Sequence, residues 1–225
     1  MTEIYNKIFN SDNHEYTIET IDVGDEHKLT WNKELGIGHI PSLKSDDEVY
    51  SQEYWDYYRT LINSDIGKNL TQARIDIANK FNVKPRDLLD IGIGNGQFVD
   101  TFGCYGTDTN KIAIEYLKKG MKYINLGSEN YKWKWFSFWD VIEHIEDVTP
   151  ILAKVDNIML STPIYKNMED CLASKHLKIN EHIYYFSVSG MITYMNHFGF
   201  DCKYYSTIES KLGRQDIGSF VFMRV

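Results

Sequence analysis

The stretch from Leu88 to Gly96 has the residue types and spacing that most directly suggest ligand binding. It reads Leu-Leu-Asp-Ile-Gly-Ile-Gly-Asn-Gly, a short apolar run followed by the acid Asp90 and glycines at alternate positions. The apolar run predicts a buried strand. Glycine has no Cβ, so the backbone can turn tightly and a ligand can lie against it. The glycines are Gly92, Gly94 and Gly96.

This pattern is typical of a turn from a strand into a helix, with or without a nucleotide-type ligand. The dinucleotide fingerprint needs a glycine three residues after its second glycine. Counted from Gly94, that position is Gln97, so the dinucleotide pattern fails. A helix beginning at Gln97 would still direct its free N–H groups toward the same crevice.

Asp108 is the second candidate ligand-binding residue. It follows the predicted strand 104–107 and lies about twenty residues after the glycine stretch begins, the offset at which an acid binds ribose hydroxyls in doubly wound folds. A carboxylate can accept both hydroxyl protons. The alternative is that Asp108 caps the next helix, although Thr109 could serve as that cap equally well.

Asp140, Glu143 and His144 are close enough in sequence to share one turn after the predicted strand 133–140. They could line a cofactor and substrate pocket, bind a divalent cation, or form the charged first turn of a helix. We prefer the pocket-lining interpretation, without a metal. His176 and His182 follow, and their spacing of six is not that of a zinc-binding helix. Histidine suits proton transfer near neutral pH, whereas His176 could instead anchor a loop.

Composition indicates an ordinary globular protein of 225 residues, 43% hydrophobic and 25% charged. There is no apolar run of about 18 residues that would span a membrane, and the first residues lack the apolar core of a signal peptide. We therefore expect a cytoplasmic protein. Three well-separated cysteines predict free thiols. The net charge of -8 disfavours binding to duplex nucleic acid.

Strands and helices are predicted to alternate along most of the chain. Residues 17–23 and 28–31 alternate as a hairpin, and Gly36, Gly38 and Pro41 mark a loop. Helices are predicted at 50–62, at 66–81 with Asp65 as N-cap, at 141–152, and at 188–198 with Ser187 as cap. A loop is predicted at 166–174, and further strands at 122–126, 155–161, 200–207 and 219–225. The last two strands would be antiparallel at the sheet edge.

We divide the chain into an N-terminal extension or cap, 1–49, and a main domain, 50–225.

From Tyr54 onward the chain resembles the class I S-adenosylmethionine-dependent methyltransferases, especially their type 11/23-like branch. The matching pieces are residues 90–96, Asp108, 138–145, 161–165, 175–176 and 181–186. The resemblance implies a Rossmann-like methyltransferase fold over residues 50–225. That fold is a doubly wound, mostly parallel seven-stranded α/β sheet with a reversed last strand and helices on both faces.

By the same resemblance, S-adenosyl-L-methionine is the expected cofactor. Its methionine part would border Asp90, Gly92, Gly94 and Gly96, and its ribose would contact Asp108 beside Thr109. Trp139 and Asp140 would lie by the sulfonium, and His144, His176 and His182 would face the substrate, where a histidine would accept a proton. The short segment between Asp108 and Trp133 departs from the family pattern, so the adenine contacts have no predicted residues.

The leading hypothesis is methyl transfer to an oxygen or nitrogen nucleophile of a small-molecule acceptor. One alternative is a non-catalytic or cofactor-sensing module that keeps the fold. Another is a methyltransferase acting on nucleotides or nucleic acid, which the charge disfavours. Fold alone does not decide among them.

Overall fold

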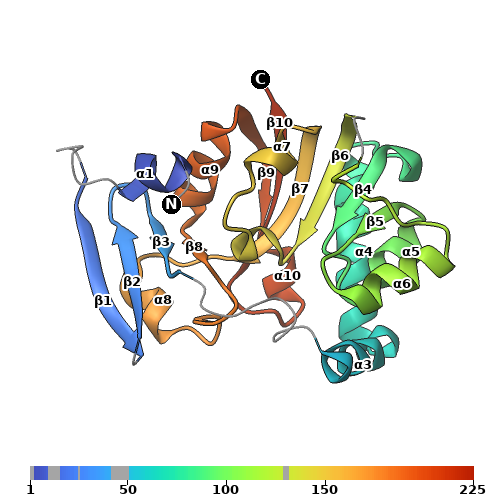
Figure 1. Cartoon of the computed structure of the whole chain (residues 1–225), viewed down its shortest axis with the longest axis horizontal. Helices are drawn as coiled ribbons and strands as arrows, with labels where there is room; N and C mark the ends of the chain where they lie inside the picture. The colour runs from blue at the N-terminus through green and yellow to red at the C-terminus, as the bar shows by residue number, and fades with distance from the viewer. Residues whose placement is uncertain (1–2, 10–15, 25, 42–50, 129–131) are drawn as a thin grey trace.

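Two β-sheets stand side by side in the computed structural model, which describes residues 3–9, 16–24, 26–41, 51–128 and 132–225 (Figure 1). The larger sheet has the strand order β5-β4-β6-β7-β10-β9. Its β4–β5, β4–β6 and β6–β7 pairs are parallel, and β10 is antiparallel to both of its neighbours. This is the doubly wound, mostly parallel α/β sheet with a reversed last strand that the sequence predicts.

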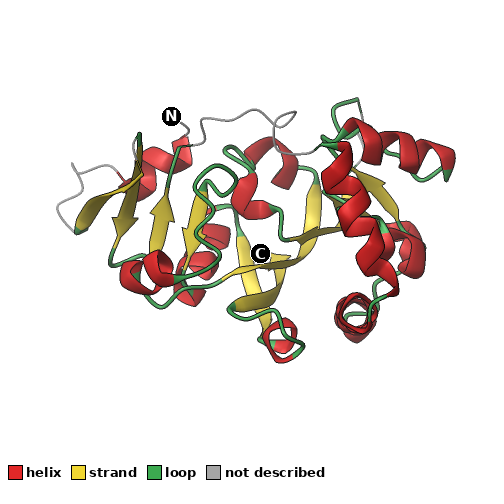
Figure 2. Ribbon diagram, turned by 90° about the horizontal axis from the view of Figure 1, so that it is seen from below, coloured by secondary structure: helices red, strands yellow, loops and turns green. Residues whose placement is uncertain are grey.

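Alternation along the strands builds a hydrophobic core on each face of this sheet, because successive side chains point to opposite faces. Leu89 packs in the core under α7 and α9, whereas Leu88 packs in the core under α4, α5 and α6. The strands are β4 Leu88–Ile91, β5 Tyr105–Thr107, β6 Trp133–Trp139, β7 Val155–Pro163, β9 Phe200–Ser206 and β10 Ile217–Arg224. Figure 2 shows helices on both sides of the strands.

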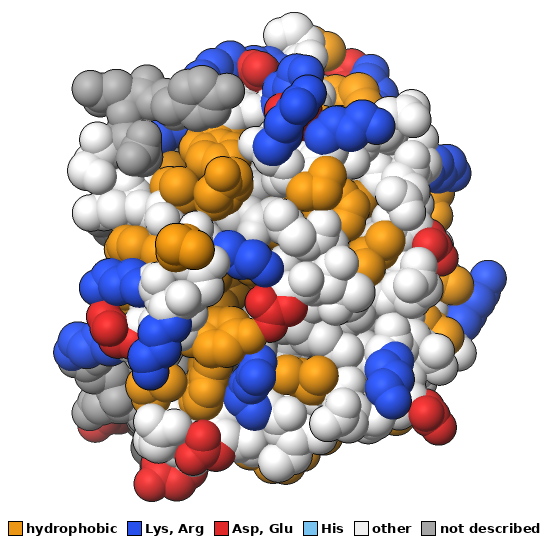
Figure 3. Space-filling model, turned by 90° about the vertical axis from the view of Figure 1, so that its right-hand side faces the viewer, with side chains coloured by type: hydrophobic (Ala, Val, Ile, Leu, Met, Phe, Trp, Pro, Cys, Tyr) orange, Lys and Arg blue, Asp and Glu red, His pale blue; other side chains and the backbone are white. Residues whose placement is uncertain are grey.

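The helices on one face are α4 Asp65–Lys80, α5 Gln97–Phe102 and α6 Lys111–Lys119, and those on the other are α7 Thr149–Leu152 and α9 Val188–His197. Helix α1 Glu3–Phe9 packs against the second, smaller sheet (Figure 1). The remaining α-helices of the described chain are α3 Gln52–Thr60, α8 Met168–Ala173 and α10 Ile208–Lys211. Short 3-10 turns are η1 Leu61–Asn63, η2 Pro85–Asp87 and η3 Ile142–His144. Figure 3 shows positive and negative side chains interspersed over the side that carries α5 and α6. No described helix is both long and apolar enough to cross a membrane.

The strand predicted at 122–126, third in chain order among the seven, is reduced to a single parallel bridge between Gly106 and Tyr123. The segment does lie beside β5, since the N–H of Ile124 donates to the carbonyl of Gly106. Because β5 has only three residues, it offers the neighbouring segment few backbone partners. The larger sheet therefore has six strands within the described chain, and this bridge beside β5 stands where a seventh strand was predicted.

The smaller sheet joins the N-terminal segment to the C-terminal half of the chain. Its strands are β1 Ile18–Gly24, β2 His27–Asn32, β3 Ile37–His39 and β8 Tyr184–Phe186. The predicted hairpin is confirmed as the antiparallel β1–β2 pair. The β3–β8 pair then attaches this hairpin to the body of the molecule. The division at residues 49 and 50 lies outside the described residues and stays a prediction.

The prediction of a loop around Gly38 is wrong, because Gly38 lies within β3. A Cβ at this position would stand 2.5 Å from Cε3 of Trp31 on the neighbouring strand. The glycine thus makes room for a buried tryptophan rather than a turn. Sequence alone does not separate these uses of glycine.

Several helix boundaries differ from the predicted ones. Ser64, not Asp65, caps α4, and its hydroxyl accepts from the N–H of Gly67. The helix predicted over 141–152 is divided into η3 and α7, with Pro150 in the first turn of the second. Proline has no N–H to donate to a preceding turn, so it favours the start of a new helix. The loop predicted at 166–174 contains α8, which Asn167 caps.

Candidate functional site

The glycine stretch forms an open bend at the carboxyl end of β4. Gly92, Gly94 and Gly96 have φ angles of 70°, 54° and 78°, in the left-handed region that favours glycine. A Cβ on Gly92 would lie 2.6 Å from Val141, and a Cβ on Gly96 would lie 2.8 Å from Tyr116. A Cβ on Gly94 would meet no atom within 4 Å. Two glycines therefore allow close packing, and Gly94 faces open space.

Helix α3 and η1 hold this bend through three hydrogen bonds. Arg59 donates from Nη1 to the carbonyl of Asn95 at 2.9 Å, and Asn95 donates from Nδ2 to the carbonyl of Tyr58 at 3.1 Å. Gln97 donates from Nε2 to the carbonyl of Ile62 at 3.0 Å. The arginine also stacks on Tyr116, 4.8 Å from the ring centroid. These polar anchors were not predicted, since none of them belongs to a recognisable motif.

Asp90 lies beneath the bend and is buried, with 1% of its surface exposed. The hydroxyl of Ser137 on β6 donates to its Oδ1 at 2.5 Å. Burial raises the pKa of Asp90 to about 8, against the opposing effects of Ser137 and Arg74. The carboxyl group therefore carries a proton at neutral pH and links β4 to β6. Its predicted place beside the methionine part of a cofactor stays a prediction.

Asp108 follows β5 at the same edge of the sheet and is partly buried. Its Oδ1 accepts from the N–H of Asn110 at 2.8 Å. The residue that caps α6 is Asn110, rather than Asp108 or Thr109. Thr109 is exposed. The Asp108 carboxylate also contributes to the raised pKa of Asp90, so the two acids lie near one another beside the bend.

Asp140, at the end of β6, belongs to an ion-pair network. Its Oδ2 accepts from Arg74 at 3.1 Å and from Arg214 at 2.6 Å. Both arginines also donate to Glu209, whose side chain is fully buried. The φ angle of Asp140 is 60°, an uncommon conformation that persists only where the surroundings impose it. The face of Trp139 is covered by Arg74, 5.0 Å from the ring centroid.

The opposing charges decide the ionisation of Asp140. Burial opposes the charged form, but Arg214 and Arg74 outweigh it and hold the pKa of Asp140 below its ordinary value. Its Oδ2 is therefore an ionised, doubly paired oxygen. Its Oδ1 and the indole Nε1 of Trp139 are buried without a hydrogen-bond partner in the part of the chain that the structure describes. Whether Asp140 and Trp139 border a sulfonium stays a prediction.

Two of the three predicted histidines lie together. The rings of His144 and His182 have centroids 4.7 Å apart and stand nearly perpendicular, at 89°. Nδ1 of His144 donates to the carbonyl of Glu181 at 2.8 Å. Burial lowers the pKa of His144, and it lowers the pKa of His182 to about 2, so both rings are neutral near pH 7. Glu143 stands beside them, fully enclosed, and burial raises its pKa to about 8.

His176 is held elsewhere. Its Nε2 donates to the carbonyl of Gln215 at 2.8 Å, and its own carbonyl accepts from the hydroxyl of Tyr165 at 3.1 Å. Partial burial lowers the pKa of His176, which is then neutral near pH 7. The hydrogen bond to a carbonyl requires a proton on Nε2, which leaves the Nδ1 lone pair free to accept.

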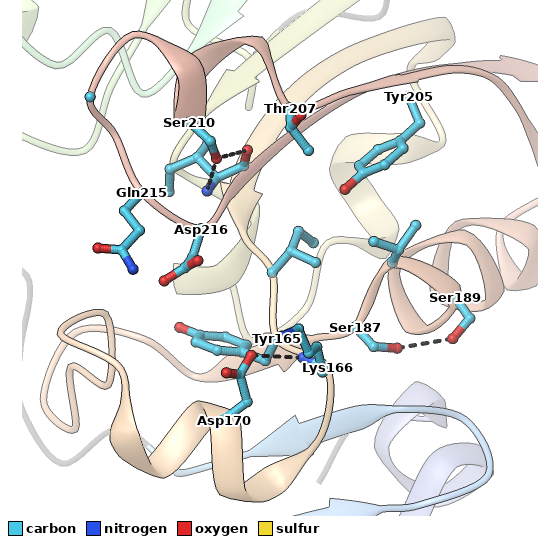
Figure 4. Close-up of a pocket in the computed structure, with 14 residues that line it drawn as sticks. Tyr165, Lys166, Asp170, Ser187, Ser189, Tyr205, Thr207, Ser210, Gln215 and Asp216 are labelled. Atoms are coloured by element: carbon cyan, nitrogen blue, oxygen red, sulfur yellow. Dashed lines mark hydrogen bonds between the residues drawn. The ribbon is translucent and has the colours of Figure 1, made fainter.

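A cavity of about 670 Å³ opens at the carboxyl ends of β7 and β9 (Figure 4). His176 does not line it, but its partner Gln215 does. Tyr165, Lys166 and Asp170 line one wall, and Gln215 and Asp216 come from the opposite wall (Figure 4). The backbone N–H of Lys166 donates to Asp170 at 3.0 Å. Since β7 is parallel to β6, and β6 is parallel to β4, this cavity opens at the same edge of the sheet as the glycine bend.

Comparisons with known proteins bear on the fold. No family model and no curated protein matches the chain. A magnesium protoporphyrin IX methyltransferase from Synechocystis, solved with bound S-adenosylhomocysteine, matches with a TM-score of 0.57 and 14% identity over 79% of this chain and 97% of that one. A S-adenosylmethionine-dependent methyltransferase from Clostridium acetobutylicum matches with a TM-score of 0.56 and 10% identity over 76% of this chain and 98% of that one. The chain therefore has the Rossmann-like fold of the class I S-adenosylmethionine-dependent methyltransferases.

Proposed function

We propose that this protein transfers a methyl group from S-adenosyl-L-methionine to an oxygen or nitrogen nucleophile of a small molecule. The observation that carries the proposal is the open bend at Gly94, at the carboxyl end of β4 in a sheet of methyltransferase topology. In doubly wound sheets, ligands bind at the carboxyl ends of the strands where the strand order reverses. The sheet runs outward from β4 in both directions, to β5 and to β6.

The chain's own residues fit this cofactor. The backbone at Gly94 offers a surface free of side-chain atoms, and Asp108 beside Thr109 offers carboxylate oxygens for ribose hydroxyls. The buried, unpartnered Nε1 of Trp139 is a further donor at the same edge within the described residues. When bound, the cofactor supplies a methyl group activated by its sulfonium. The protein's part is to align the acceptor for in-line attack.

The cavity beside β7 is the proposed acceptor pocket. Its acids, Asp170 and Asp216, suit an acceptor that carries hydroxyl or amino groups, because carboxylates accept hydrogen bonds. His176 is the histidine bonded to this wall, through Gln215. We assign His176 as proton acceptor through Nδ1, while His144 and His182 stay proposed substrate-facing residues. The net charge of -8 makes a nucleic-acid acceptor the weaker alternative.

The cofactor assignment is tested by calorimetric titration of the full chain with S-adenosylhomocysteine. We expect one site, and we expect Asp108→Ala to weaken binding by roughly 10- to 100-fold, the effect of losing a hydrogen bond to a charged group. Asp76→Ala is the matched control, because Asp76 is an exposed acid on α4 that bonds only Gln72 among the described contacts. Absence of binding to the folded chain would refute the cofactor, and unchanged affinity in Asp108→Ala would remove the ribose role of Asp108.

The role of His176 is tested by turnover. Once an acceptor is found by screening hydroxyl- and amine-bearing compounds, His176→Gln should lower kcat by about 10²- to 10⁴-fold and leave the affinity for S-adenosylhomocysteine unchanged. The wild-type rate should fall as the pH drops through the pKa of His176, which lies below the ordinary histidine value of 6.5. The reason is that a protonated imidazole ring cannot accept the proton of the acceptor molecule. Cofactor binding without turnover on any acceptor would instead favour the non-catalytic, cofactor-sensing module.

A further inference from the structure

Glu143, His144 and His182 bring three possible metal ligands together where β6 ends. One side-chain oxygen or nitrogen of each lies within 4.8 Å of those of the other two. Atoms at these separations share a centre within about 2.8 Å of each, so shifts of about 0.8 Å would reach the roughly 2.0–2.2 Å of metal–ligand bonds. Side-chain adjustment alone can therefore bring all three atoms to bonding distance of one cation.

The hydrogen bond of His144 prepares its ring to bind a cation. The carbonyl of Glu181 can only accept, so Nδ1 of His144 carries the proton and Nε2 keeps its lone pair. Metal-binding histidines nearly always donate their other ring N–H to a carbonyl or carboxylate in this way. A backbone bond from the N–H of Ile183 to the carbonyl of Glu143, at 2.8 Å, fixes the two ligand-bearing segments together.

The carboxylate of Glu143 is an independent indication of a ligand. The residue is 1% exposed, and neither of its carboxylate oxygens has a hydrogen-bond partner in the described chain. Thr162 lies close enough to affect its ionisation, but it makes no hydrogen bond of regular geometry with it. Buried polar groups nearly always have a partner, so an unpartnered carboxylate beside two imidazoles points to a bound group.

A further buried polar atom without a hydrogen-bond partner lies near Glu143. It is the hydroxyl of Thr162 at the end of β7, again counting only described residues. The unpartnered hydroxyl of Ser161 lies on the other face of the sheet, because successive side chains of a strand point to opposite faces. The hydroxyl of Thr162 could bind water or substrate that completes the shell of a cation.

Charge balance leaves Glu143 without a cation of its own. In the neighbouring network, the guanidiniums of Arg74 and Arg214 face the carboxylates of Asp140 and Glu209, so two positive charges meet two negative ones. Among the described residues, no ion pair includes Glu143, and the nearby Lys178 pairs with Glu181. A divalent cation would supply the counter-charge that the ionised form of this buried carboxyl group needs.

We infer that Glu143, His144 and His182 form a binding site for one divalent cation of the zinc and cobalt class. Two imidazoles and one carboxylate suit Zn²⁺, Co²⁺ or Fe²⁺, whereas Mg²⁺ and Ca²⁺ prefer oxygen ligands throughout. Three protein ligands leave a position for water or a substrate oxygen, as in catalytic rather than structural zinc sites. The site uses only the chain's own residues, so it does not depend on the proposed methyl transfer.

The test is titration of the tag-free, metal-stripped full chain with Co²⁺, followed by visible absorption and by the thermal unfolding midpoint. We expect one equivalent of Co²⁺ with a d–d spectrum typical of nitrogen and oxygen ligands, displacement by Zn²⁺, and a rise in the midpoint because the cation binds the folded state. The variants Glu143→Gln and His182→Gln should each weaken Co²⁺ binding by more than roughly 10- to 100-fold. That is the loss caused by removing a residue that only hydrogen-bonds a metal ligand, and removing the ligand itself should cost more. The controls Glu115→Gln and His197→Gln alter exposed residues outside the cluster and should bind as the wild type does.

Two outcomes would overturn the inference. The first is a folded wild-type chain that takes up no Co²⁺ or Zn²⁺, and this result does not depend on whether a variant folds. The second is Co²⁺ binding that both cluster variants retain at wild-type affinity while circular dichroism shows them folded. Tighter uptake of Mg²⁺ than of Zn²⁺ at the same stoichiometry would contradict the assigned class of cation. Failure to bind S-adenosylhomocysteine would leave the cation site unaffected.

Discussion

Two regions lie along the same edge of the larger sheet: the glycine bend, residues 92–96, and the histidine cluster, Glu143, His144 and His182. The chain assembles them differently. The bend consists of consecutive residues between β4 and α5, and its shape depends on left-handed glycine conformations. The cluster joins η3 to the segment before β8, through the contact of His144 with His182. A site made of consecutive residues leaves a motif in the sequence, whereas a site made by tertiary contact does not.

The ion-pair network lies between the two regions. It links α4, the end of β6 and the segment from α10 to β10 through Arg74, Asp140, Glu209 and Arg214. Asp140 is the shared member, since it precedes the cluster by three residues and follows the strand that hydrogen-bonds Asp90. We therefore expect the network to stabilise both regions, and the bend and the cluster to respond separately to local changes.

The largest expected effect is on stability, from Arg74→Met. Removing this guanidinium leaves the fully buried Glu209 with one cation, and breaking a buried pair typically costs about 3–5 kcal/mol. Chemical denaturation measures the free energy of unfolding. The control Arg86→Met removes an exposed arginine whose nearest acid lies 3.9 Å away, and it should change stability by less than about 0.5 kcal/mol. Equal stability of the two variants would show that the network does not hold the regions together.

The second effect separates the bend from the cluster, and it comes from Gly94→Ala. The new methyl group would enter the open space at the bend and reduce affinity for S-adenosylhomocysteine by about 1–3 kcal/mol, the usual cost of overfilling a fitted site. Gly103→Ala is matched to it, because Gly103 also has a positive φ, 83°, and its nearest Cβ contact is at 4.0 Å. Both variants carry the same kind of backbone strain. Calorimetry should detect weaker binding in Gly94→Ala alone, and Co²⁺ binding should persist in both.

The third effect concerns the buried carboxyl group beneath the bend. Folded Asp90 keeps its proton up to about pH 8, whereas the unfolded chain releases it near the ordinary value of 3.8. Between these two pH values, unfolding releases the proton of Asp90. The contribution of Asp90 to the free energy of unfolding is therefore fully present below about pH 4 and is lost as the pH rises toward about 8. The loss reaches about 1.4 kcal/mol per pH unit. Asp90→Asn should remove this slope from unfolding curves measured between pH 6 and 7.5. A slope equal to that of wild type would show that Asp90 is ionised in the folded chain.

The sequence predicts most of the larger sheet, because its strands are continuous apolar runs separated by glycine, proline and polar turns. It also predicts the glycine bend and the hairpin of β1 and β2, where spacing alone is sufficient. Unlike the sheet, the bend and the hairpin, the contact between two of the histidines has no signal in the sequence. In the sequence His176 and His182 lie six residues apart in one stretch, whereas the fold places His182 against His144 and leaves His176 on Gln215.

The arginines show what sequence reasoning missed and which signal was present. Only five of the 24 basic residues are arginine. Four of these five donate inward, to backbone carbonyls or to the ion-pair network, and only Arg86 does not. Arginine presents several donors in a fixed geometry, so a chain that otherwise prefers lysine uses it where bonds must be directed. Scarcity could have marked Arg59, Arg74 and Arg214 before their partners were known.

The most direct test of the central claim is a crystal structure of the full chain with S-adenosylhomocysteine. We predict that the amino-acid part of the ligand lies against the backbone at Gly94, a ribose hydroxyl lies within hydrogen-bond distance of Asp108, and the sulfur faces the cavity beside β7. A ligand found elsewhere, or a bend at Gly94 closed by side chains in crystals grown with saturating ligand, would contradict this prediction.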